Sequence, residues 1–221
     1  MGIRKKVGFF GKYIMSIAIY SEEKRDASCD NWCVSGGRKM SIPNNTSNHC
    51  AIRSAGDLIR EYKINTKSAI DVKDICKQLG INLFITDISD LEEKYNKKKV
   101  SGALYFADGK ADIFVNAKDS EERQRFTIAH ELGHYFLHID KTSAQKRAIV
   151  SLRSDRNDLE RSADFFAAEL LMPADRVNDV YKEFEEKQKI PYISDLAQIF
   201  NVSKAAMHYR LDSLGKNYIR L

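Results

Sequence analysis

Apolar residues recur at helical spacing in the middle of the chain and predict a long helix there. Asp119, followed three residues later by Glu122, is typical of a capping box and marks the start of this helix. The apolar positions then fall on one stripe of a 3.6-residue period. This stripe consists of Phe126, Ala129, Leu132, Gly133, Phe136 and Leu137. A helix with this pattern packs against the core on its apolar side and leaves its other side for chemistry.

The other side of the predicted helix carries the run His130-Glu131-Leu132-Gly133-His134. Because His130 and His134 lie one turn apart, both imidazoles leave the same face and can converge on one metal ion. Glu131 is rotated by about 100° from His130. Its carboxylate therefore lies beside the metal, where it can take a proton from a bound water. The same pattern arises by chance when two histidines lie on a surface helix. A third ligand would distinguish a metal site from such a chance match.

A second helix is predicted from Asn157 to Pro173, which ends it. Glu160 and Asp164 lie one turn apart on one face of this helix. A catalytic zinc site typically has three protein ligands and one water, and two His with one Glu is a standard set, so we expect Glu160 to be the third ligand. We expect Asp164 to accept a hydrogen bond from the free ring nitrogen of a ligating histidine. The alternatives are a capping box with Asn157 for Glu160 and a solvated carboxylate for Asp164.

The longer metzincin pattern is excluded, because it requires Gly at position 137 and His at position 140, where this chain has Leu137 and Asp140. His138 lies about 12 Å along the helix from His130, given a rise of 1.5 Å per residue. We therefore assign His138 a packing role or a supporting role behind the ligands. The donor for a developing oxyanion is left open among Tyr105, Tyr135, His138 and His208.

Together, the run from Arg125 to His138 and the segment from Glu160 to Pro173 resemble the ImmA/IrrE family of metallo-endopeptidases, over roughly residues 52–214. The resemblance implies a zincin-like core and a zinc cofactor. It implies a cytoplasmic enzyme of bacteria, phages or mobile elements. It also implies a protein substrate, an Xre-like helix-turn-helix repressor whose cleavage switches on silenced genes. The remaining alternatives are a non-enzymatic DNA- or protein-binding regulator and the toxin of a toxin–antitoxin pair.

The segment before the long helix predicts a small sheet and two short helices, which makes the fold class α+β. Asp108-Gly109 is a turn signal that joins two strands into a hairpin. We expect the hairpin strand Ala111–Asn116 to offer an edge to extended substrate. The segment from Ile139 to Arg156 is polar and is predicted to be a loop. The remaining predictions are helices over 52–63 and 68–79, strands over Ile81–Thr86 and Val100–Ala107, and a charged loop or exposed helix over Asp90–Lys99.

Residues 1–50 differ in composition from the rest of the chain and are predicted to be a poorly ordered extension. They hold 8 Lys/Arg against 4 Asp/Glu, whereas residues 51–221 hold 28 against 27. The apolar run from Val7 to Tyr20 resembles part of a signal peptide, but Lys12 interrupts it and no small-x-small cleavage site follows. This run is also shorter than the roughly 20 residues that span a bilayer. We therefore expect no membrane association.

Three of the 4 cysteines lie in this extension, together with His49. A second zinc site from Cys29, Cys33, His49 and Cys50 would have poor ligand spacing. Reduced, unpaired thiols are the favoured interpretation, and Cys76 is assigned to the core.

The C-terminal part is predicted to be a helix-turn-helix-like module. A charged helix over Ala174–Gln188 precedes two helices over Ser194–Phe200 and Ser203–Leu214, with Ser194 and Ser203 as N-caps. The last helix is expected to expose Lys204, His208 and Arg210. Four cations against two carboxylates from Pro191 to Leu221 are few for DNA binding, so protein contact or packing is favoured. The predicted organisation is an extension (1–50), a metallopeptidase core (51–173) and a helical module (174–221).

Overall fold

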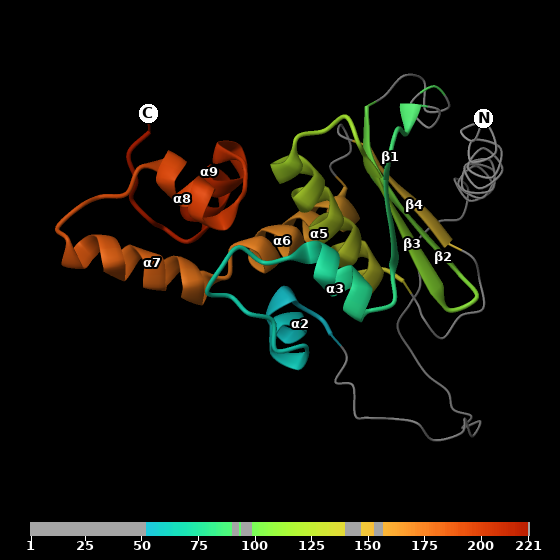
Figure 1. Cartoon of the computed structure of the whole chain (residues 1–221), viewed down its shortest axis with the longest axis horizontal. Coiled ribbons are helices and arrows are strands. Elements are labelled where there is room, and N and C mark those ends of the chain that lie inside the picture. The colour runs from blue at the N-terminus through green and yellow to red at the C-terminus, as the bar shows by residue number, and fades with distance from the viewer. Residues whose placement is uncertain (1–51, 90–92, 94–98, 140–146, 153–156, 221) are drawn as a thin grey trace, which may run out of the picture.

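A four-stranded sheet and the helices packed against it form the core of the chain, which confirms the α+β class (Figure 1). The computed structural model describes residues 52–89, 93, 99–139, 147–152 and 157–220. The predicted extension, with Cys29, Cys33 and Cys50, lies outside the described residues. None of the helices in the described part of the chain is long and apolar enough to cross a membrane.

The strands lie in the order β1 (Asn82–Thr86), β3 (Lys110–Asn116), β2 (Val100–Ala107) and β4 (Arg147–Leu152). β1 runs parallel to β3, and the other neighbours are antiparallel. The predicted hairpin is confirmed, since Ala107 pairs with Lys110 across the two-residue loop Asp108-Gly109. Both loop residues have positive φ, 51° and 74°, as the tight turns that match the twist of a hairpin require.

Two expectations about the sheet are wrong. Strand β4 lies within the segment 139–156, which its polar composition had assigned to a loop. The backbone of this six-residue segment adds to β2, an interaction that local composition does not encode. Strand β3 lies between β1 and β2, so its hydrogen-bonding groups are used inside the sheet and it is not the edge offered to substrate. Among the described strands, β1 and β4 form the two edges of the sheet, and β4 lies next to β2.

The helices begin at side chains that cap them. Helix α2 begins after Ser54, α3 after Asp71, α5 after Ser120 and α6 after Asn157, and each cap accepts a hydrogen bond from a backbone N–H of the first turn. The predicted cap of α5 at Asp119 is therefore wrong by one residue, because the Oγ atom of Ser120 accepts from the N–H of Arg123. The bounds are α2 (Ala55–Glu61), α3 (Val72–Gln78), α5 (Glu121–Leu137), α6 (Asp158–Leu171) and α7 (Ala174–Glu186).

Helices α5 and α6 pack at very short range. A Cβ atom on Gly133 of α5 would lie 3.0 Å from the Cα and 3.1 Å from the carbonyl oxygen of Ala163 in α6. Glycine at this position lets the two backbones approach more closely than any side chain would permit. The opposite side of α5 faces the sheet, because α5 also contacts β2 and β3. The polar stripe of α5 is therefore buried as well, including Thr127, Glu131 and both histidines.

Two buried arginines attach the C-terminal helices α8 (Ile193–Phe200) and α9 (Lys204–Ser213) to the core. The Nε atom of Arg125 donates to the carbonyl of Asn201 at 3.0 Å. The Nε atom of Arg210 donates to the carbonyl of Met172 at 2.9 Å. The expectation that Arg210 is exposed is therefore wrong, since a backbone carbonyl at the end of α6 recruits its guanidinium.

The predicted caps of these two helices have different outcomes. Ser203 caps α9 as expected, because its Oγ accepts from the N–H of Ala206. Ser194 does not cap α8, which begins after Tyr192 without a side-chain cap. Ser194 lies inside the first turn of that helix, two residues after the cap position Tyr192, so its hydroxyl lies too late in the chain to cap the free backbone N–H groups.

Gly133→Ala should destabilise the protein by about 1–3 kcal/mol, because the added methyl overpacks the contact between α5 and α6. Gly56→Ala in α2 is the matched control, since its nearest neighbours, Arg60 and Ser54, lie at ordinary distances of 3.5 and 3.6 Å. The control should gain up to about 1 kcal/mol from helix propensity alone. Urea unfolding measures both. A Gly133→Ala protein as stable as the wild type would contradict the close packing.

Candidate metal centre

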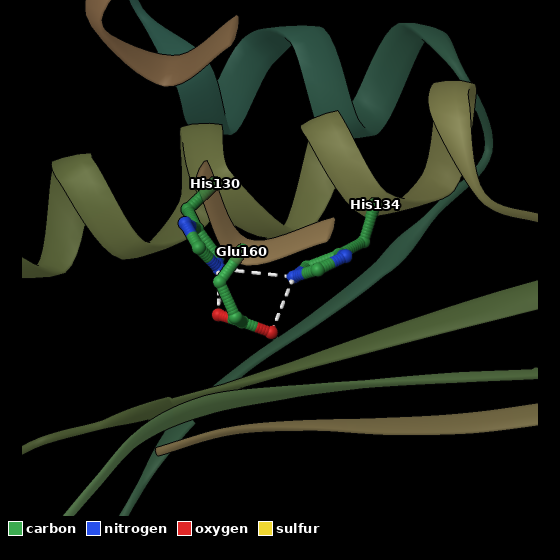
Figure 2. A group of neighbouring side chains, drawn as sticks. All are labelled: His130, His134 and Glu160. Carbon is green, nitrogen blue, oxygen red and sulfur yellow. Dashed lines mark hydrogen bonds and ion pairs between the residues drawn. The ribbon is translucent and has the colours of Figure 1, made fainter. Parts of the chain in front are cut away.

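Three side chains from α5 and α6 converge on one point, as Figure 2 shows. The Nε2 atoms of His130 and His134 lie 3.0 Å apart. The two oxygens of Glu160 lie 3.1 Å from His130 Nε2 and 3.2 Å from His134 Nε2. The residues are between 0% and 8% exposed, so water screens this cluster poorly. The structure thus brings together the three residues that the sequence analysis named as ligands.

The cluster has the chemistry and spacing of a site for a small divalent cation. Ligands about 2.0–2.1 Å from a tetrahedral zinc ion lie roughly 3.3 Å from one another. The three separations here, 3.0, 3.1 and 3.2 Å, are close to that value. Two imidazole nitrogens and one carboxylate are also a common zinc ligand set. The group therefore fits a zinc-sized ion without rearrangement of the backbone.

Glu160 follows the cap of α6, and its side chain is used in the cluster and not in a capping box. Its backbone N–H donates to the Oδ1 atom of Asn157 at 2.9 Å, which is the helix cap. Its side chain does not complete a capping box but points to the histidines. The cap fixes the start of α6, and Glu160 lies one turn in, where its carboxylate can reach α5.

His130 is held from behind by Asp164, whose Oδ1 lies 2.8 Å from His130 Nδ1. A carboxylate only accepts, so Nδ1 carries the hydrogen. Burial lowers the pKa of His130, but the hydrogen bonds to Asp164 and Glu160 outweigh it and raise the pKa to about 10. Burial raises the pKa of Glu160, and the hydrogen bonds from both histidines outweigh it and lower the pKa to about 2. The Glu160 carboxylate is therefore charged near pH 7, and Asp164 and Glu160 together favour a positive charge on His130.

Glu131 is fully buried beside this cluster and is not part of it. A Cβ atom on Gly102 of β2 would lie 2.9 Å from Glu131 Oε1, which places the carboxylate against that strand. The same Cβ would lie 2.5 Å from the methyl carbon of Thr127. Gly102 therefore makes room for both side chains. The sequence offered no signal for this role of Gly102, because the contact joins residues far apart along the chain.

His138 and Ser162 form a hydrogen-bonded chain behind His134. The Nδ1 atoms of His134 and His138 lie 2.8 Å apart, and His138 Nε2 lies 3.0 Å from Ser162 Oγ. Burial and the nearby His134 lower the pKa of His138 to about 4, so its ring is neutral near pH 7. The supporting role expected for His138 agrees with this position. The sequence analysis did not single out Ser162, because a serine among charged helix residues carries no distinguishing signal.

For two of the four residues considered as oxyanion donors, the hydrogen-bond or ion-pair partners are known. His138 contacts His134 and Ser162. His208 lies on α9, where it contacts Tyr218 and Asp212. Tyr105 on β2 and Tyr135 on α5 stay predictions for this role.

A mixed sheet that carries a helix with this His-Glu-x-x-His motif, together with a glutamate from the next helix, defines a metallopeptidase. The profile of the peptidase family described as "IrrE N-terminal-like domain" matches residues 76–212, which is more than half of the chain. The chain therefore belongs to the ImmA/IrrE family of metallo-endopeptidases, which confirms the resemblance in the sequence. The family implies a bound divalent metal ion.

Two relatives illustrate this membership. The metallopeptidase ImmA of Bacillus subtilis is 28% identical over 153 residues, which cover 65% of this chain and 83% of that protein. The radiation response metalloprotease IrrE of Deinococcus deserti is 31% identical over 109 residues, 45% of this chain and 35% of that protein.

Gly102→Ala should reduce peptidase activity by at least tenfold, because its methyl displaces the Glu131 carboxylate and the Thr127 side chain. Thr127→Ser removes the methyl carbon that lies 2.5 Å from the new Cβ. The double variant should therefore recover part of the activity and stability, although the carbonyl oxygen of Phe114 at 2.9 Å still opposes the methyl. Activity and thermal unfolding measured over the double-mutant cycle test this coupling. If the effects of the two substitutions are additive, the new methyl group and the Thr127 and Glu131 side chains do not compete for the same space.

Proposed function

We propose that this protein is a zinc-dependent endopeptidase in which His130, His134 and Glu160 hold the ion. The observation that carries the proposal is the convergence of two imidazole nitrogens and a carboxylate within 3.2 Å of one another. Zinc is favoured over magnesium or calcium by a set of three donors in which two are imidazole nitrogens.

Each residue around the site has a distinct proposed role. A zinc ion held there supplies Lewis acidity, which acidifies a water molecule and polarises a peptide carbonyl. Glu131 takes the proton from that water and later delivers it to the leaving amine. Its position beside the ligands, between α5 and β2, suits a group that must reach the water without binding the metal. Asp164 keeps the Nε2 atom of His130 free of hydrogen by accepting from Nδ1.

The proposed substrate is a protein, and specifically an Xre-like helix-turn-helix repressor. Its cleavage in the cytoplasm would switch on the genes that it silences, in a phage, a mobile element or a stress response. The family membership supports a protein substrate. Strand β4 supports an extended mode of binding: among the described residues it pairs only with β2, so its other edge can pair with a peptide backbone. The substrate would therefore bind at β4 and not at β3.

The C-terminal helices are proposed to form a helix-turn-helix-like unit that packs or contacts proteins. Helices α8 and α9 are joined by a tight turn in which Asn201 has a φ of 49°. Arg210 is buried against Met172 and cannot reach a phosphate. Among the described side chains of α9, this leaves Lys204 as the exposed cation, with His208 half-buried. One cation on this helix is too few for the phosphate contacts that dominate DNA binding.

The substrate is tested by incubating the protein with zinc and the helix-turn-helix repressor encoded next to it. A discrete cut that a chelator abolishes is the expected result, followed by mass spectrometry of the two fragments. Glu131→Gln should bind zinc normally and lose about 10²–10⁴-fold in cleavage rate. Glu186→Gln on α7, an exposed carboxylate, is the matched control and should cut like the wild type. Cleavage by Glu131→Gln at the control rate would refute the role of Glu131, and an intact repressor would refute the substrate.

Glu160→Ala should lose tight zinc binding, because it leaves two protein ligands in a site that needs three. Zinc content after dialysis, measured by atomic emission, gives the result directly. Asn157→Ala is the matched control: it removes the cap at 2.9 Å while the Glu160 carboxylate stays in place. The control should cost about 1 kcal/mol of stability and retain zinc. Full retention of metal by Glu160→Ala would rule out this site.

A further inference from the structure

Among the histidines in the described part of the chain, His138 lies near the site and is not used by the proposed mechanism. We propose that His138 and Ser162 form a relay that fixes the hydrogen of His134 on Nδ1, which keeps its Nε2 atom open toward the metal position. His138 and Ser162 are thus positioning residues that act through His134. This inference rests on the proposed metal site, and it assigns a role to two residues outside the ligand set.

The direction of the relay follows from its far end. The Oγ atom of Ser162 lies 2.8 Å from the carbonyl oxygen of Leu159. A carbonyl can only accept, and a hydroxyl has a single hydrogen, so Ser162 donates to Leu159. At its other contact, 3.0 Å from His138 Nε2, Ser162 must therefore accept. It follows that His138 carries a hydrogen on Nε2.

The near end of the relay is determined in turn. A neutral imidazole with its hydrogen on Nε2 has a lone pair on Nδ1. The contact of 2.8 Å between the Nδ1 atoms of His138 and His134 is then a hydrogen bond only if His134 donates. His134 therefore carries its hydrogen on Nδ1. Its Nε2 atom faces the position between His130 and Glu160 and is the ring nitrogen left for a metal ion.

Burial makes the relay necessary for His134 in particular. The His134 side chain is 0% exposed, so water cannot replace His138 as the acceptor behind it. His130 differs, because the Asp164 carboxylate behind it is 60% exposed and can exchange with solvent partners. If Ser162 is removed, His138 can shift its hydrogen to Nδ1 and donate to His134. His134 would then carry its hydrogen on Nε2, and that hydrogen must leave before a metal ion binds.

The relay is tested by the zinc affinity of four variants, measured by competition with a chromogenic chelator. Ser162→Ala and His138→Phe should each weaken zinc binding by about 10–100-fold, the usual effect of losing a partner behind a metal ligand. Ser162→Thr keeps the hydroxyl and should restore wild-type affinity. Ser213→Ala is the matched control, because Ser213 donates to the carbonyl of Arg210 at 2.7 Å in the same way, but on α9. It should bind zinc like the wild type.

A second readout needs no metal and no substrate. Long-range proton–nitrogen spectra of ¹⁵N-histidine-labelled, metal-free protein report which ring nitrogen carries the hydrogen. An Nε2 hydrogen on His138 in the wild type, lost or mixed in Ser162→Ala, is the expected result. Wild-type zinc affinity in both Ser162→Ala and His138→Phe would overturn the relay, as would an Nδ1 hydrogen on His138. Tight zinc binding without cleavage of any protein would instead overturn the proposed function and leave the relay standing.

Discussion

The contact between α5 and α6 is the constraint on which the site depends. His130 and His134 lie on α5, and Glu160, Asp164 and Ser162 lie on α6, so the contacts between these side chains need the two helices in register. Gly133 allows this approach, because it has no side chain. The Cα atom of Ala163 lies only 3.0 Å from the position that a Cβ atom on residue 133 would take. Ala163 lies between Ser162 and Asp164 in sequence. The residues on either side of this close contact therefore reach α5: Asp164 contacts His130, and Ser162 contacts His138.

The site also requires that each buried polar group in the cluster has a hydrogen-bond partner. Unpaired polar groups in a low-dielectric interior are costly, and a fully connected network is stable and rigid. Here each ligating histidine has a partner behind it, Asp164 at 2.8 Å for His130 and His138 at 2.8 Å for His134. These partners orient the two rings before any ion arrives. The raised pKa of His130 and the lowered pKa of Glu160 show that the cluster itself favours a cation.

Local sequence patterns predicted the parts of this protein that depend on nearby residues. The helix around His130 and His134, the second helix with Glu160, and the hairpin at Asp108-Gly109 all have signals within a few residues. The failures have tertiary causes. Strand β4 exists because β2 has a free side to pair with, Arg210 is buried because the end of α6 offers a carbonyl, and Ser162 matters because His138 faces it across 24 residues of chain.

The C-terminal helices contact the core near the start of α5 and just after the end of α6. Arg125 in the second turn of α5 donates to Asn201, and Arg210 of α9 donates to Met172, which directly follows α6. Burial lowers the pKa of both guanidinium groups, and nearby carboxylates oppose it only in part: Asp71 and Glu121 for Arg125, and Glu169 for Arg210. Burying a guanidinium group is costly unless hydrogen bonds and nearby opposite charges compensate for its lost hydration. These two hydrogen bonds link the C-terminal helices to the helices that carry the site residues, which agrees with the packing role proposed for them.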